Sequence, residues 1–136
     1  MNSIRSNRRQ ILAGVGASAA VLTIGGPAVA QAGSYAKFVI RVPNERDKAS
    51  TVKVAVKLPA GISFVSFQPK AGWTRTVTMA KLATPLKTGD GQITERIDTV
   101  TWTAKPGSAI APGEFDEFGI VVAVPATPGK SLVFPA

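Results

Sequence analysis

The sequence lacks cysteine and histidine altogether among its 136 residues. Without cysteine, the chain can form no disulfide, no thiolate metal site and no cysteine nucleophile. Without histidine, it lacks the most common general base and the most common protein ligand of metals, and a serine–histidine–carboxylate triad is excluded. These absences argue against a hydrolase.

Acidic residues are also scarce, with 8 Asp and Glu against 16 Lys and Arg. The basic residues that follow the N-terminal arginines are spread along the chain and form no run. Aromatic residues do not alternate with them, as a base-stacking surface requires. Diffuse positive charge is typical of a solvated surface, so we expect no binding to nucleic acid.

The first 30 residues have the three parts of a secretory signal peptide: arginines, an uncharged apolar segment at 11–24, and "GGPAVA" with a small-residue cleavage pattern. The pair Arg8-Arg9, followed by "QIL", resembles a twin-arginine export signal. We predict cleavage after Ala30 or after Ala32.

An uncleaved membrane anchor is the alternative interpretation of this segment. Its apolar core is shorter than the ~20 residues that a bilayer-spanning helix needs. We therefore expect an exported protein of the periplasm or cell envelope, which contacts a membrane only if the signal is not removed.

From Gly33 onward the hydrophobic residues follow a period of two, which is typical of β-strands. In "TVKVAVKL" the pattern places Val52, Val54, Val56 and Leu58 on one face. Prolines, Pro85 among them, are expected at strand boundaries, and "TGDG" at 88–91 is the clearest hairpin turn. Six or seven short strands with frequent turns predict an all-β, two-sheet β-sandwich over residues 31–136.

Two tryptophans could be functional. Trp73 opens one predicted strand and Trp102 lies within another. Either could stack on a sugar or line a metal site. Because large aromatic side chains commonly fill a small sandwich core, each burying about 150–250 Å², packing is the expected role of both.

Carboxylates are the remaining candidates for metal ligands. Glu114, Asp116 and Glu117 lie together in "GEFDEFG", but their spacing matches no EF-hand, and solvated carboxylates near a turn are the simpler interpretation. Glu45 follows a proline-ended strand in "RVPNERD". Its residue type and position alone fit a loop carboxylate in a weak surface ion pair.

Several motifs in order resemble the YcnI-like copper-binding domain family of exported bacterial proteins. They are "VPNE", "LPAGI", "GW", "VTW" and "PGEFDEF", within a resemblance that covers roughly Gly33 to Phe134. The resemblance implies an immunoglobulin- or cupredoxin-like β-sandwich that handles copper(II) at the cell envelope. It also implies a copper site made of an N-terminal histidine, a glutamate in the "VPNE" loop and a tryptophan near the C-terminus.

Glu45 occupies the position of the family glutamate. The family histidine and the C-terminal tryptophan have no counterpart here, and Trp73 and Trp102 match other positions of the pattern. The resemblance therefore implies a domain shortened at both ends, with Glu45 as its remaining metal ligand. Because copper(II) prefers nitrogen donors, we expect weak copper binding, or no bound copper in this chain.

Taken together, the sequence predicts a non-enzymatic copper-binding or copper-chaperone-like protein whose metal site is incomplete. Its expected partner is a protein that donates or accepts copper. The alternative is a metal-free envelope module that binds a protein partner through an open sheet edge, because loss of terminal strands leaves backbone groups unpaired.

Overall fold

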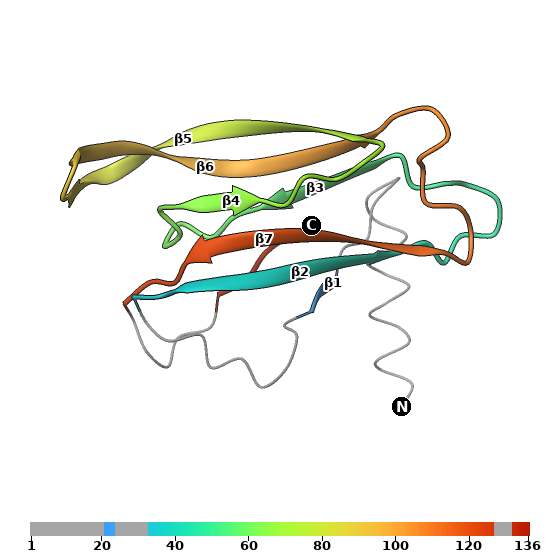
Figure 1. The fold of residues 1–136 in the computed structure, drawn as a ribbon, viewed down its shortest axis with the longest axis horizontal. Coiled ribbons are helices and arrows are strands. Elements are labelled where there is room, and N and C mark those ends of the chain that lie inside the picture. Colours follow the sequence, from blue (N-terminus) through green and yellow to red (C-terminus); the bar gives the residue numbers. More distant parts are fainter. Residues whose placement is uncertain (1–20, 24–32, 127–131) are drawn as a thin grey trace.

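The computed structural model describes residues 21–23, 33–126 and 132–136. Within these ranges no helix has the length and apolar character needed to cross a bilayer. The strands are β1 (Val21–Thr23), β2 (Tyr35–Pro43), β3 (Lys53–Lys57), β4 (Val65–Phe67), β5 (Trp73–Thr88), β6 (Gly91–Ala104) and β7 (Phe115–Ala123). Figure 1 shows that they form two layers, so the predicted all-β sandwich is confirmed.

One layer is a four-stranded sheet in the order β1-β2-β7-β4, and the other is a three-stranded sheet in the order β3-β6-β5. Every pairing is antiparallel. β2 and β7 pair along their whole length, from Tyr35 opposite Ala123 to Pro43 opposite Phe115. This register sets which side chains share each face of the first sheet.

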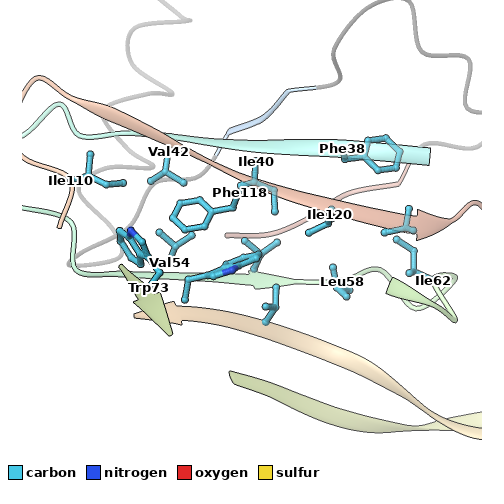
Figure 2. Close-up of a cluster of buried hydrophobic side chains, with 14 residues drawn as sticks. Phe38, Ile40, Val42, Val54, Leu58, Ile62, Trp73, Ile110, Phe118 and Ile120 are labelled. Carbon is cyan, nitrogen blue, oxygen red and sulfur yellow. The ribbon is translucent and has the colours of Figure 1, made fainter. Parts of the chain in front are cut away.

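The core lies between the two sheets and takes alternate residues from β2, β3, β6 and β7, whereas β5 contributes Trp73 alone of the fully buried residues. Figure 2 shows these side chains converging from both layers. The buried apolar residues are Phe38, Ile40, Val42, Val54, Val56, Leu58, Ile62, Trp73, Val100, Trp102, Ile110, Phe118, Ile120 and Val122. Burial of each large side chain contributes about 1.5–3 kcal/mol, which makes this cluster the main source of stability.

Alternation predicted the inward residues of β3 correctly, with the exception of Val52. Val54, Val56 and Leu58 are buried, whereas Val52 precedes the strand and is 49% exposed. The ladder begins only at Lys53, and the backbone carbonyl of Val52 accepts a hydrogen bond from the N–H of Ala104. The period of two therefore continues to Leu58, which follows β3, but fails at Val52, which precedes it.

The β5–β6 hairpin is longer than the predicted short strands. Its strands have 16 and 14 residues, and Figure 1 shows that it extends beyond the end of the other layer. The predicted turn at 88–91 is confirmed, with Thr88 opposite Gly91 and a positive φ of 140° at Gly91. Pro85 does not end a strand: β5 continues through it, with a register shift between Lys81 and Leu86. An edge strand tolerates this proline because its missing N–H removes no bond to a second neighbour.

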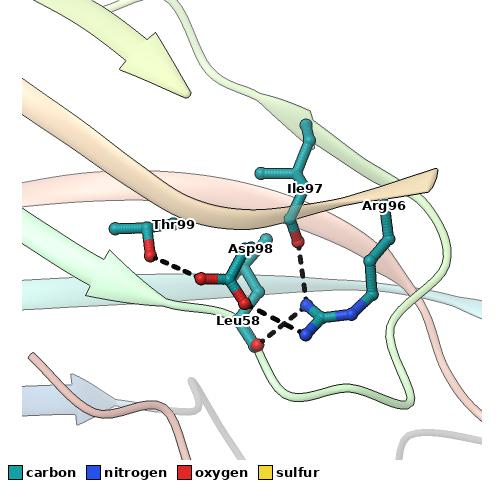
Figure 3. Close-up of polar contacts among 5 residues, drawn as sticks. All are labelled: Leu58, Arg96, Ile97, Asp98 and Thr99. Carbon is teal, nitrogen blue, oxygen red and sulfur yellow. Dashed lines mark hydrogen bonds and ion pairs between the residues drawn. The ribbon is translucent and has the colours of Figure 1, made fainter. Parts of the chain in front are cut away.

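Arg96 joins the base of this hairpin to the end of β3 (Figure 3). Its guanidinium donates to the backbone carbonyls of Leu58 and Ile97, at 3.2 and 3.1 Å, and to a carboxylate oxygen of Asp98 at 3.0 Å. Asp98 lies at a register shift in β6 and also accepts a hydrogen bond from Thr99 at 3.1 Å. The network holds the two strands together where the hairpin leaves the sandwich.

The C-terminal residues close the gap between the sheets on the β3 side. Leu132, Phe134 and Ala136 pack against the core, and the ring centroids of Phe134 and Phe38 are 6.1 Å apart. The backbone N–H of Lys57 donates to the carbonyl of Pro135 at 2.8 Å. The chain end thus covers part of the edge of β3 that faces away from β6.

Candidate metal centre

Asn44 organises the loop that follows β2. Its side chain is 2% exposed. The side-chain nitrogen donates to the carbonyls of Ala49 at 2.7 Å and Ile110 at 2.8 Å, while its oxygen accepts from the N–H of Arg46 at 3.0 Å. An amide with every polar group satisfied can remain buried at no net penalty. It therefore fixes the backbone on both sides of Glu45.

A second loop lies alongside and is held by backbone bonds. The N–H of Asn44 donates to the carbonyl of Glu114 at 2.8 Å, and the N–H of Gly113 donates to the carbonyl of Asn44 at 2.9 Å. The sequence did not predict that these two loops are neighbours. Neither loop carries a sequence pattern that indicates which other loop it contacts.

Glu45 has an exposed side chain at the end of β2, directly after the buried Asn44. An accessible carboxylate on a backbone fixed by its neighbour is a suitable oxygen donor for a metal ion. The geometry is compatible with the predicted ligand role of Glu45, which stays a prediction.

The other candidate carboxylates have separate partners. The side chain of Glu114 accepts from the N–H of Ala111 at 3.1 Å, within its own turn. Asp116 forms an ion pair with Lys70. Glu117 accepts two hydrogen bonds from Arg41, at 2.8 and 2.9 Å, on the outer face of the sheet. The three "GEFDEFG" carboxylates therefore contact three different partners and do not converge on one point. No group of three metal-ligating side chains occurs in the described part of the chain.

The two tryptophans are core residues, as packing arguments predicted. Trp73 is 7% exposed and Trp102 is 2% exposed. Both pack against Phe118, with ring centroids 5.1 and 5.0 Å away. Neither ring is available to stack on a sugar or to line a metal site at the surface.

The pairing of β1 and of Gly33 shows which described backbone segments lie near Glu45 and which do not. Val21 lies opposite Arg41 and Thr23 opposite Val39, so β1 starts toward the Glu45 end of β2. Gly33 lies at the other end, where its N–H donates to the carbonyl of Val124 at 3.0 Å. The nine residues of β2 separate the two positions by about 26 Å. Cleavage after Ala32 would make Gly33 the new N-terminus. Its terminal amine would be too distant to share a metal ion with Glu45.

Comparison with known proteins identifies the family. The sequence profile described as "Domain of unknown function (DUF1775)" matches residues 23–136. The chain belongs to the DUF1775 family. Together with the relative described next, this match confirms the YcnI-like assignment made from the sequence motifs.

Among relatives of this DUF1775 chain is a protein of Bacillus subtilis (strain 168) named "Copper-binding protein CutI". It is 32% identical over 99 residues, which are 73% of this chain and 41% of the relative. The chain thus spans less than half the length of that protein.

A solved structure supports the fold of the DUF1775 domain. It is a protein from Nocardia farcinica whose crystal structure is described as an immunoglobulin-like fold. The match has a TM-score of 0.56 and 27% identity, and covers 86% of this chain and 73% of the other. The predicted immunoglobulin-like class of sandwich is therefore confirmed.

Proposed function

We propose that this protein binds or delivers copper(II) at the cell envelope and is not an enzyme. The observation that carries the proposal is the similarity to the copper-binding CutI over 73% of the chain. Glu45 supports it structurally, because the buried Asn44 fixes the loop that presents this exposed carboxylate. Copper(II) is here the cargo of the protein.

The donor set in the described residues does not fit a complete copper(II) site. One carboxylate supplies oxygen, and the chain has no imidazole or thiolate to add. Because copper(II) prefers nitrogen ligands, Glu45 alone gives weak binding. Copper would then be held firmly only when further donors come from a protein that donates or accepts the ion.

The test is a copper(II) titration of the untagged protein monitored by electron paramagnetic resonance. Weak but specific binding, with a copper(II) signal that is lost in Glu45→Gln and kept in Asp47→Asn, is the expected result. Asp47 is an exposed carboxylate two residues away, so it controls for surface charge. Since the chain has no histidine, any nitrogen coupling reports an amine or amide ligand. Equal signals in both variants, or no specific signal, would contradict the proposal.

A second candidate function rests on the edge of β5. In the sheet order β3-β6-β5, this strand has β6 on one side and no strand on the other within the described residues. After Trp73, all of its residues are exposed or half-buried. Such an edge can accept a strand from a protein partner, which would make the domain a metal-free binding module.

A single substitution in β5 can block strand addition at this edge and so tests the second candidate function. The backbone N–H of Ala104 donates to the carbonyl of Val52, which directly precedes β3. Ala104 and its partner in β5, Trp73, are therefore not a hydrogen-bonded pair. Alternate residues of β5, among them Val77, then direct their backbone N–H away from β6. Val77→Pro should leave the hairpin folded and abolish strand addition. Site-specific cross-linking from β5 in cells, lost in Val77→Pro and kept in Val77→Thr, would support this function over copper delivery.

A further inference from the structure

The outer face of the β1-β2-β7-β4 sheet, which turns away from the core, carries an ordered pattern of side chains. Register and backbone bonds align residues of β2, of β7 and of the β4 segment in rows. These rows are Tyr35–Ala123–Phe64, Lys37–Val121–Ser66, Val39–Gly119–Gln68 and Arg41–Glu117, followed by Pro43–Phe115 at the end. β7 occupies the middle of the three rows that also include the β4 segment.

The middle of this face is hollowed around Gly119, and the side chain of Gln68 occupies the space directly above the glycine. Two adjoining depressions of about 280 and 390 Å³ share Lys37, Gln68 and Gly119 in their lining. A Cβ on Gly119 would lie 2.3 Å from the side-chain oxygen of Gln68, so the Gln68 side chain lies over the glycine. We call this the Gly119 trough, and its polar lining consists of Lys37, Ser66, Gln68, Glu117 and the ion-paired Lys70 and Asp116.

Exposed aromatic rings stand at both ends of the trough. At one end Tyr35 is 67% exposed and meets Phe64 edge to face, with ring centroids 5.5 Å apart. At the other end Phe115 is 61% exposed, and the guanidinium of Arg41 lies 5.5 Å from its ring centre. Residues 115 to 123 of β7 separate these ends by about 27 Å. Large exposed aromatic residues that flank a depression are a common feature of binding surfaces.

The charges on this face mostly neutralise one another. Arg41 pairs with Glu117, and Lys70 pairs with Asp116 beside the trough. Lys37 adds a single positive charge. A surface for nucleic acid or another polyanion would need several cations without carboxylates beside them. The trough instead offers the amide of Gln68 and the ammonium group of Lys37 beside ion pairs that neutralise one another, which suits an uncharged polar ligand.

We propose that the Gly119 trough binds a linear, neutral oligosaccharide. A pyranose ring has apolar C–H faces and a rim of hydroxyl groups. The C–H faces would pack on the rings of Tyr35 and Phe115, while the hydroxyl groups would exchange hydrogen bonds with Gln68 and Lys37 between them. A proline-rich peptide fits less well, since its docking grooves are lined by aromatic side chains along their length, and here the middle of the trough is polar.

The proposal is tested by titrating the isotope-labelled protein, with its full sequence, with chitohexaose and with cellohexaose, and following its backbone amide signals. Binding of at least one sugar should shift signals of β2, β4 and β7. Tyr35→Ala and Phe115→Ala should each raise the Kd at least tenfold. The matched control is Met79→Ala on β5, a 53% exposed apolar residue of the other sheet, which should leave the Kd unchanged.

Several results would overturn the proposal. One is the absence of shifts with either sugar at millimolar concentration, and another is binding that neither aromatic variant weakens. A hexaproline peptide serves as the competing probe: if it binds with the same sensitivity to Tyr35→Ala and Phe115→Ala while the sugars do not, the trough is a peptide site. Unfolding curves that match the parent protein ensure that a loss of binding is not a loss of fold. A chelator in the buffer keeps this test independent of copper.

Discussion

The side-chain amide of Asn44 donates to the backbone carbonyl of Ile110 at 2.8 Å, although 66 positions separate the two residues in the chain. This bond joins the loop after β2 to the segment before β7, and it lies directly beside Glu45. The candidate metal ligand is therefore positioned by a residue that cannot itself serve as the acidic donor.

Replacing Asn44 with alanine should destabilise the fold and displace Glu45. The change removes the hydrogen bonds from the Asn44 side chain to the carbonyls of Ala49 and Ile110, so that the Ile110 carbonyl keeps only the N–H of Thr51, and the loss costs about 2–3 kcal/mol. Urea unfolding monitored by tryptophan fluorescence measures the loss. Asp47→Ala, at an exposed position in the same loop, should change the unfolding free energy by less than about 0.5 kcal/mol. Equal effects of the two substitutions would show that the buried amide is not the anchor.

Removal of the Arg96 side chain should loosen the base of the β5–β6 hairpin. Arg96 is only 10% exposed and satisfies the carbonyls of Leu58 and Ile97 as well as the carboxylate of Asp98. Arg96→Ala should cost about 1–3 kcal/mol, since it leaves a half-buried carboxylate without its charged donor. Hydrogen exchange should become faster in β3 and in the neighbouring part of β6. Lys87→Ala, an exposed change in the same hairpin, is the control and should leave exchange unaltered.

Gly72→Ala should be among the most destabilising single changes outside the core. Gly72 has a φ of 77°, and an added Cβ would lie 2.2 Å from the Ser108 hydroxyl oxygen and 2.7 Å from its Cβ. Backbone strain of this kind costs about 1–3 kcal/mol before the clash is counted. Ser108→Gly removes the clash but not the strain, so the double variant should recover part of the lost stability. Thermal unfolding of the four proteins measures this coupling, and strictly additive effects would contradict the clash.

Export should remove the first strand. The predicted cleavage after Ala30 or Ala32 falls beyond β1, whose backbone pairs with Val39, Ile40 and Arg41 of β2. Intact-mass analysis of protein isolated from the cell envelope should give a chain that starts at Gln31 or Gly33. In that chain the backbone amides along this edge of β2 should exchange faster than in the uncleaved protein. A mature chain that keeps Val21–Thr23 would show that the predicted cleavage site is wrong and that β1 belongs to the working domain.

Much of the fold was predictable, because hydrophobic alternation is a local property that persists in a regular sandwich. The inward positions of Val54, Val56 and Leu58, the burial of Trp73 and Trp102, and the turn at 88–91 agree with the predictions from the sequence. The failures lie where the pattern meets an irregular segment or an edge. Val52 lies just outside the β3 ladder, and Pro85 is accommodated in the outermost strand of its sheet.

The candidate site was less predictable, because it depends on which loops become neighbours. Glu45 was identified through a family resemblance, and its role remains a prediction. The contact between Asn44 and the 113–114 turn has no local signal, since it forms only when β2 and β7 pair along their length.

The sequence alone determined the sandwich class, the residue chemistry that is excluded, and the identity of the core, since composition and the period of two are fixed by the order of residues. The tertiary structure decided the partners of the charged groups. In the folded protein Asp116 forms an ion pair with Lys70, and Glu117 forms one with Arg41. Tyr35 and Phe115 lie at opposite ends of the Gly119 trough. The physical reason is register: which side chains share a row across strands is set by hydrogen-bonded pairing between distant segments, and no local pattern records that pairing.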